Sequence, residues 1–191
     1  QNADGGWGNW PGEFSNRFVT TYALWGLWNA QQEGHEVPDW VLDRAVGYLD
    51  RNFVAPTDLQ DTAGGRSTLN TLAFVLAEMG EGDPGRMSTL YDVRERMDHY
   101  GRALLALALA AQSPDDVRVQ TLLDELEGAA IQTGSAAWWQ EEQVDLQAFN
   151  TDVRTTAIVL DAFSLLRPEA PLLPRVVRWL MQAREAGVWS N

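Results

Sequence analysis

The chain has 191 residues, a length that suits one domain, or two small ones, with a sizeable hydrophobic core. It has 14 basic residues, all arginine, and 27 acidic residues. The resulting net charge of −13 argues against binding to nucleic acid or anionic membranes. The absence of cysteine excludes disulfides, thiol catalysis and cysteine-ligated zinc within these residues. No apolar run reaches the roughly 18 residues of a membrane span.

The two ends of the sequence carry similar glycine–tryptophan segments. Gln1–Trp10 reads QNADGGWGNW, and Gln182–Trp189 reads QAREAGVW. We expect the glycine to end a helix in a left-handed conformation and the tryptophan to pack between one helical hairpin and the next. Because both ends stand at the same point of a repeat, and the chain opens on Gln1 without a leader, residues 1–191 are expected to form one domain, a fragment of a larger array within a multidomain protein.

Four segments are apolar on nearly every side, which predicts helices buried on every side. They are Phe18–Trp28, Leu69–Met79, Ala103–Ala111 and Val153–Leu166. Four other segments are amphipathic, with apolar residues three and four positions apart, which predicts helices with one face in water. Their apolar stripes are formed by Leu42, Ala45, Val46, Leu49 and Phe53; by Met87, Leu90, Tyr91 and Met97; by Val119, Leu122, Leu123 and Leu126; and by Leu173, Val176, Val177 and Leu180.

Prolines, capping residues and glycines mark the expected ends of these helices. Asp83 and Ser113 are predicted N-caps, and Ser113 with Asp116 resembles a capping box. The prolines expected in first helical turns are Pro38, Pro84 and Pro114, and the glycines expected to stop helices are Gly34, Gly80 and Gly187.

Strict alternation of the two kinds of helix predicts an all-α fold in two layers. We expect a partial α/α toroid of about four inner and outer helix pairs, like that of terpenoid cyclases and prenyltransferases, with a plain helical bundle as the alternative. Residues 134–150 read GSAAWWQEEQVDLQAFN and lack a helical stripe, so a short hairpin or an extended loop is expected there.

Several segments resemble the thioester-domain region of bacterial alpha-2-macroglobulins. The resemblance covers QNADGGWGNW, then TTYALWGL at Thr20–Leu27, DVRTTAIVLDAF at Asp152–Phe163, and RWLMQAREAGVWSN at Arg178–Asn191. It implies an extracytoplasmic protease-trapping inhibitor, whose bait segment is cut and whose thioester acylates the attacking protease. The thioester comes from a C-x-E-Q motif expected upstream of Gln1, so no catalytic residue carries over. Proteases and the other domains of the parent protein are the implied partners.

Candidate site residues are few. His35 and His99 are isolated and lack metal-ligand spacing, which favours structural or surface roles. Glu141, Glu142, Asp145 and Asp152 gather near Trp138 and Trp139, a pattern that suggests glycoside hydrolysis but also fits a solvated acidic loop.

We therefore predict no catalytic, cofactor-binding or metal-binding residue and no enzymatic activity of the fragment. The alternatives are a toroid enzyme acting on polysaccharide and a helical-repeat module that binds a protein. An incomplete toroid exposes apolar edges, so a dimer through those edges is also expected.

Overall fold

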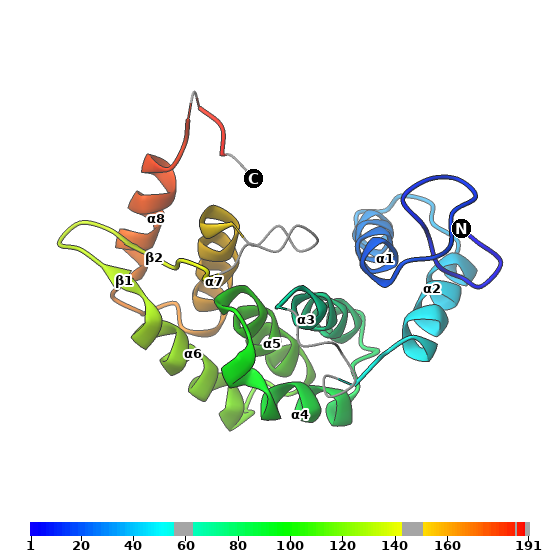
Figure 1. Ribbon diagram of the computed structural model, residues 1–191, viewed down its shortest axis with the longest axis horizontal. Coiled ribbons are helices and arrows are strands. Elements are labelled where there is room, and N and C mark those ends of the chain that lie inside the picture. The colour runs from blue at the N-terminus through cyan, green and yellow to red at the C-terminus, as the bar shows by residue number, and fades with distance from the viewer. Residues whose placement is uncertain (56–62, 143–150, 186, 190–191) are drawn as a thin grey trace.

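The computed structural model describes residues 1–55, 63–142, 151–185 and 187–189, and within them the chain is mostly helical (Figure 1). The all-α fold class is thereby confirmed. The inner helices are α1 (Arg17–Gln32), α3 (Ala63–Glu78), α5 (His99–Gln112) and α7 (Asp152–Leu166). The outer helices are α2 (Asp39–Arg51), α4 (Pro84–Asp92), α6 (Val117–Ala129) and α8 (Leu173–Gln182).

The inner helices stand side by side in a curved row, and the outer helices lie along its convex side (Figure 1). Each inner helix packs on its outer partner and on the next inner helix, so the alternation expected from the sequence is present. The described residues form an open arc, with α1 and α2 at one end and α7 and α8 at the other. A closed toroid stays a prediction.

Burial is complete in the middle of the row and partial at its ends. In α3 every residue from 67 to 77 is buried, and in α5 so is every residue from 103 to 109. By contrast, α1 buries only Thr20, Thr21 and Leu24, and Leu165 of α7 is 66% exposed. All-round burial was thus predicted correctly for α3 and α5 and wrongly for α1 and α7, because each end helix has an inner neighbour on one side only.

The outer helices bury the predicted apolar stripes only in part, since Val177 of the stripe on α8 is 47% exposed and the stripe on α4 is interrupted. Leu42 and Leu49 of α2, and Leu122 of α6, lie in the core. The predicted second stripe is broken, because α4 ends at Asp92 and a short 3-10 helix, η1 (Arg94–Arg96), follows it. Met97 is buried, but it lies beyond η1 and not on the face of α4.

Several predicted helix ends are confirmed. Asp83 caps α4, its side chain accepting the Arg86 N–H, and Pro84 is the first residue of that helix. The stop glycines Gly34 and Gly80 directly follow the C-cap positions of α1 and α3, with φ values of 85° and 81°. The prediction for Gly187 is wrong, because α8 already ends at Gln182, although Gly187 does have a positive φ of 87°.

The predictions for Ser113 and for Pro38 differ from the structure. The prediction for Ser113 is wrong, because it ends α5 and Asp116 caps α6 instead. The Asp116 carboxylate accepts the Arg118 N–H at 2.9 Å and pairs with the Arg118 guanidinium at 2.6 Å, which makes it the stronger cap. Pro38 stands one position before α2, as its N-cap residue.

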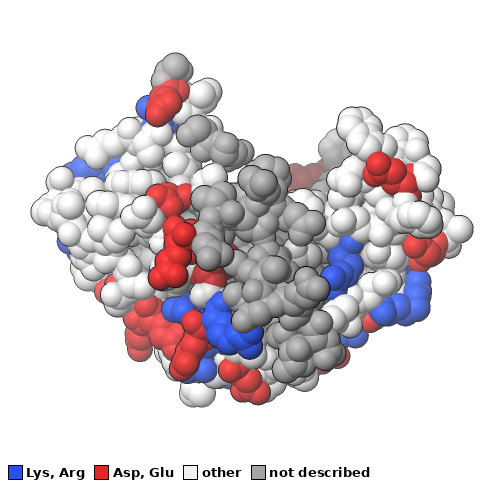
Figure 2. Space-filling view, in the orientation of Figure 1, with Lys and Arg blue, Asp and Glu red and all other residues white. Residues whose placement is uncertain are grey.

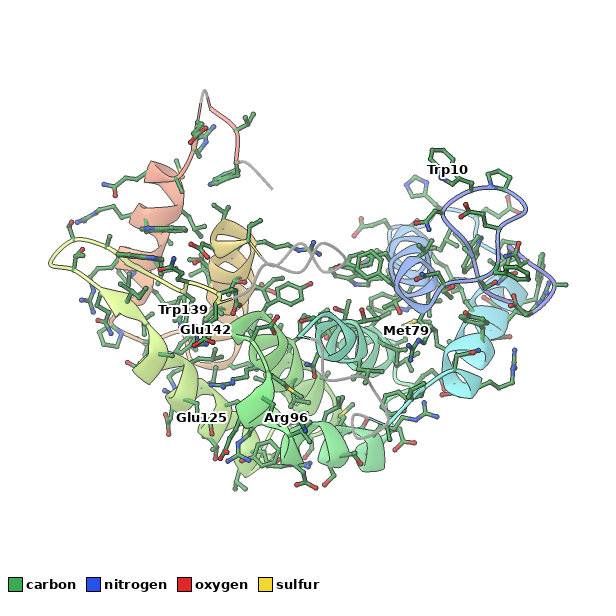
Figure 3. All side chains as sticks on the ribbon, viewed as in Figure 1. Trp10, Met79, Arg96, Glu125, Trp139 and Glu142 are labelled. Carbon is green, nitrogen blue, oxygen red and sulfur yellow. The ribbon has the colours of Figure 1, made fainter. Side chains whose placement is uncertain are left out.

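A short hairpin follows α6; its first strand lies before the region 134–150 where a hairpin or loop was expected, and its second strand lies inside it. Strands β1 (Ile131–Gln132) and β2 (Ala137–Trp138) pair antiparallel. The next residue, Trp139, is fully buried between α6 and α7 (Figure 3). Its indole N–H donates to the Leu126 carbonyl at 2.7 Å. The hairpin is therefore fixed to the helices, whereas residues 143–150 lie outside the described part of the chain.

Candidate functional site

The first turns of the inner helices meet on one rim of the arc, where several carboxyl groups gather. Asp98 caps α5 by accepting the Gly101 N–H at 2.7 Å, and its other oxygen accepts the Ser67 hydroxyl of α3 at 2.7 Å. Thr151 caps α7 by accepting the Arg154 N–H at 3.3 Å. On this rim, side-chain oxygens therefore accept hydrogen bonds from the backbone N–H groups that a first helical turn leaves without a partner.

Glu141 is the most enclosed carboxyl group on this rim, with 8% of its surface exposed. Its Oε1 atom accepts the Tyr100 N–H at 2.9 Å and the Thr155 hydroxyl at 2.8 Å. Its Oε2 atom accepts the His99 N–H at 3.2 Å. Glu141 thus connects the segment after β2 to the first turns of both α5 and α7.

Burial, and after it the negative charge of Asp98, raise the pKa of Glu141 to about 7. The hydrogen bonds from Tyr100, Thr155 and His99 oppose this shift, because they favour the ionised form. Asp152, the first residue of α7, accepts the backbone N–H of Glu141 at 3.2 Å. The arrangement fits a structural connection, since both oxygens of Glu141 already have donors.

Two tyrosines and an arginine join three inner helices beside this rim. The Tyr22 and Tyr100 hydroxyls lie 3.2 Å apart. The Arg154 guanidinium donates to both hydroxyls, at 3.3 Å to Tyr100, and lies 5.6 Å and 5.3 Å from the two ring centroids. This Tyr22–Tyr100–Arg154 cluster connects α1, α5 and α7, and burial raises the pKa of Tyr100.

The structure separates the two histidines. His35 is exposed in the turn between α1 and α2. His99 begins α5, and burial lowers the pKa of its imidazole. Across the described ranges, no three His, Asp or Glu side chains are grouped closely enough to hold a metal ion.

The predicted carboxylate cluster is only partly assembled. Glu141 and Asp152 are brought together, Glu142 is exposed, and Asp145 lies outside the described residues. Glycoside hydrolysis needs a carboxylic acid free to donate its proton to substrate, whereas Glu141 is enclosed and hydrogen-bonded to backbone. The hydrolase alternative therefore gains no support from this geometry.

Sequence reasoning missed Asp98 and Arg154. An Asp immediately before an apolar helical run is an N-cap signal, so Asp98 could have been found. Arg154 could not, because its tyrosine partners lie 132 and 54 positions away.

The terminal glycine–tryptophan segments match the prediction in part, because neither glycine directly follows a described helix. Gly5 has φ +97°, and a Cβ atom there would come within 2.2 Å of the Arg44 carbonyl oxygen. Trp7 packs against the core, and its N–H donates to the Thr20 hydroxyl at 2.9 Å. Trp189 donates its indole N–H to the Leu180 carbonyl at 2.7 Å, yet 47% of its surface is exposed. Tryptophan packing is therefore confirmed for Trp7 and only partial for Trp189.

Exposed apolar side chains are concentrated at the two ends of the arc. In the described part of the chain, only Val117 and Ile131 among the large exposed hydrophobic residues lie outside the first and last hairpins and their flanking segments. The others belong to the first or last hairpin or its flanking segment: Trp10, Phe14, Trp40, Leu165, Val177, Met181, Val188 and Trp189. Trp10 projects outward at one end (Figure 3). On the face shown in Figure 2, large parts of both ends are uncharged.

None of the helices that the structure describes is both long enough and apolar enough to cross a lipid bilayer.

Comparison with solved structures shows what this fold is similar to. The chain superposes on Escherichia coli alpha-2-macroglobulin activated by porcine elastase with a TM-score of 0.79, at 17% identity over 100% of this chain. The chain has the fold of a segment of bacterial alpha-2-macroglobulin.

Two further structures agree. The native Escherichia coli alpha-2-macroglobulin gives a TM-score of 0.76 at 18% identity over 94% of this chain. Salmonella alpha-2-macroglobulin reacted with methylamine gives 0.74 at 20% identity over 96%. The chain spans only 17%, 11% and 12% of these three alpha-2-macroglobulin chains, respectively. No family model and no curated protein matches the sequence.

Proposed function

We propose that the chain is a non-catalytic part of the thioester-containing domain of an alpha-2-macroglobulin-like protease-trapping inhibitor. The observation that carries this proposal is a fold match that extends over nearly the whole chain and recurs in several bacterial alpha-2-macroglobulin structures. The resemblance of the terminal segments and of Asp152–Phe163 to that family supports it independently.

The same proposal accounts for the exposed apolar ends of the arc. Each is the surface that another helical hairpin covers in the middle of the row, where α3 and α5 are fully buried. Residues 1–191 then form part of one larger α/α toroid inside a multidomain protein, and other domains of that protein are among its partners.

In this proposal the chain has a packing role rather than a chemical one. It holds no cysteine, so the reactive thioester of such a domain is supplied by other residues of the parent protein. The described rim uses its carboxyl groups to bind backbone N–H groups at helix starts. Proteases are the targets of the whole protein, which acts outside the cytoplasm.

The complete coding sequence of the natural protein tests this proposal. We expect flanking β-sandwich domains and further helical hairpins of the toroid. A C-x-E-Q motif shortly before Gln1 would indicate that the parent protein traps proteases covalently. Its absence would indicate trapping without a thioester. A reading frame that holds no domain besides this helical array would contradict the proposal.

A further inference from the structure

Arg154 is a half-buried cation whose acceptors within the described residues are both neutral. Its Nη2 atom donates to the Tyr22 and Tyr100 hydroxyls, and the N–H groups on Nε and Nη1 have no acceptor in this part of the chain. None of the ion pairs among the described residues includes Arg154. Other half-buried arginines do pair with carboxylates, at 2.5 to 3.0 Å: Arg86, Arg94, Arg118 and Arg167.

This cation lies on the concave side of the arc. Arg154 belongs to α7 and Tyr22 to α1, and these helices stand at opposite ends of the row, with α3 and α5 between them (Figure 1). Their contact therefore passes across the concave side of the row, near the first turns of its helices. The guanidinium carbon lies 5.6 Å from the ring centroid of Tyr22 and 5.3 Å from that of Tyr100, so the two rings fix its position.

Aromatic rings on α1 continue from this cation along one helix face. Phe18, Tyr22 and Trp25 stand four and three positions apart, which places them on the same side of the helix. The ring centroids lie 4.7 Å apart for Phe18 and Tyr22, and 6.3 Å apart for Tyr22 and Trp25. All three side chains are half-buried, so each keeps part of its surface open. These three residues, the aromatic row, offer apolar surface beside the Arg154 guanidinium.

The carboxyl groups at the starts of α5 and α7 bind other donors. Glu141 accepts the Tyr100 N–H at 2.9 Å and the Thr155 hydroxyl at 2.8 Å. Asp152 accepts the backbone N–H of Glu141 at 3.2 Å. Neither carboxylate pairs with Arg154, although both lie on neighbouring turns of the rim. A carboxylate from a ligand therefore has no competitor for the Nε and Nη1 donors within the described residues.

We propose that Arg154 and the aromatic row bind a ligand that carries a carboxylate next to an aromatic group. The carboxylate accepts charge-assisted hydrogen bonds from Nε and Nη1, and the aromatic group packs on the rings of Phe18 and Tyr22. Both parts are needed, because an ion pair that is open to solvent contributes little by itself. A free aromatic acid and a peptide that ends in phenylalanine share this chemistry. The site lies outside the protease-trapping role and does not depend on it.

An NMR titration of the 191-residue chain tests the site with a matched pair of ligands. N-acetylphenylalanine carries the carboxylate, and N-acetylphenylalaninamide has the same aromatic group without the charge. We expect the acid to bind with a Kd on the order of 1 mM and to shift the Nε–H signal of Arg154. The amide should bind at least about tenfold more weakly, because it cannot form the charge-assisted bonds.

Two further ligands separate the parts and the sources. N-acetylglycine keeps the carboxylate but lacks the ring, so it should also bind about tenfold more weakly than N-acetylphenylalanine. An acetylated Gly-Gly-Phe peptide with a free carboxylate should bind at least as tightly as the acid. Tighter binding of this peptide indicates a peptide terminus as the ligand, and equal binding indicates a small aromatic acid; either supports the site.

Arg154→Met should weaken binding of the acid to the level of the amide, and the exposed control Arg178→Met should keep the wild-type affinity. Equal affinity for acid and amide, no binding of either, or wild-type affinity in Arg154→Met would overturn the proposal. If Arg154→Met does not fold, the comparison of acid with amide and the Nε–H signal of Arg154 decide the matter in the wild-type chain. An Nε–H signal that stays in place while the acid binds rejects the site.

Discussion

Trp139 shows how one side chain fixes an irregular segment to a helical array. It is fully buried, its ring lies against Phe163 of α7, and its indole N–H is bonded to the last turn of α6. An indole combines a large apolar surface with one donor, so it can fill a core site and satisfy a free helix carbonyl together. Its neighbour Trp138 stacks on Trp179 of α8, with ring centroids 5.8 Å apart.

Replacing Trp139 with alanine is therefore expected to lower the free energy of unfolding by about 3–5 kcal/mol, through the cavity and the lost hydrogen bond. Urea denaturation followed by circular dichroism measures this. The matched control is Trp10→Ala, since Trp10 is 72% exposed and its removal should change stability by less than about 0.5 kcal/mol. Equal effects of the two substitutions would show that Trp139 has no such role.

At the scale of the elements, the alternation of fully apolar and amphipathic helices could be predicted from the sequence, because a helix buried on all sides and a helix buried on one side have different patterns of apolar residues. The cap at Asp83 and the stop at Gly80 could also be predicted, because each depends on the residue type at a single position next to the helix. The Tyr22–Tyr100–Arg154 cluster was not, because it depends on which distant turns the curvature of the row brings together. Glu141 was noticed only as one acid among many, since its enclosure is a tertiary property.

Because Arg154 connects three inner helices, Arg154→Met should keep the fold but loosen the row. We expect a loss of about 1–3 kcal/mol in unfolding free energy, from charge-assisted hydrogen bonds and cation–π contacts in a half-buried setting. Small-angle X-ray scattering should show a larger radius of gyration. Arg178→Met is the control, since exposed Arg178 makes only a 3.3 Å bond to the Ser135 carbonyl, and it should alter neither quantity.

At the scale of the whole molecule, the arc exposes apolar surface where the row of helices stops. Leu165 and Met181 at one end and Phe14 at the other are at least half exposed, whereas the middle of the row is closed. The sequence indicated this through its matching terminal segments, but it could not show that α1 and α7 are only partly buried. That loss reflects the number of neighbours rather than helix composition.

Such ends should make the 191-residue chain associate with itself at high concentration. We expect light scattering to give an apparent mass that rises with concentration, and Val177→Glu with Met181→Glu to suppress the rise, because charge on the end face opposes its burial. An apparent mass that stays at the monomer value over the whole concentration range would show that the ends of the arc do not mediate self-association.

The central claim is that this fold belongs to a protease-trapping protein. Its most direct test is whether the full-length natural protein inhibits trypsin. The measurement compares trypsin activity on a large protein substrate and on a small peptide, with the 191-residue chain alone as control. The proposed function predicts loss of activity on the large substrate only, and no effect of the isolated chain. Unchanged cleavage of the large substrate in the presence of excess full-length protein would contradict it.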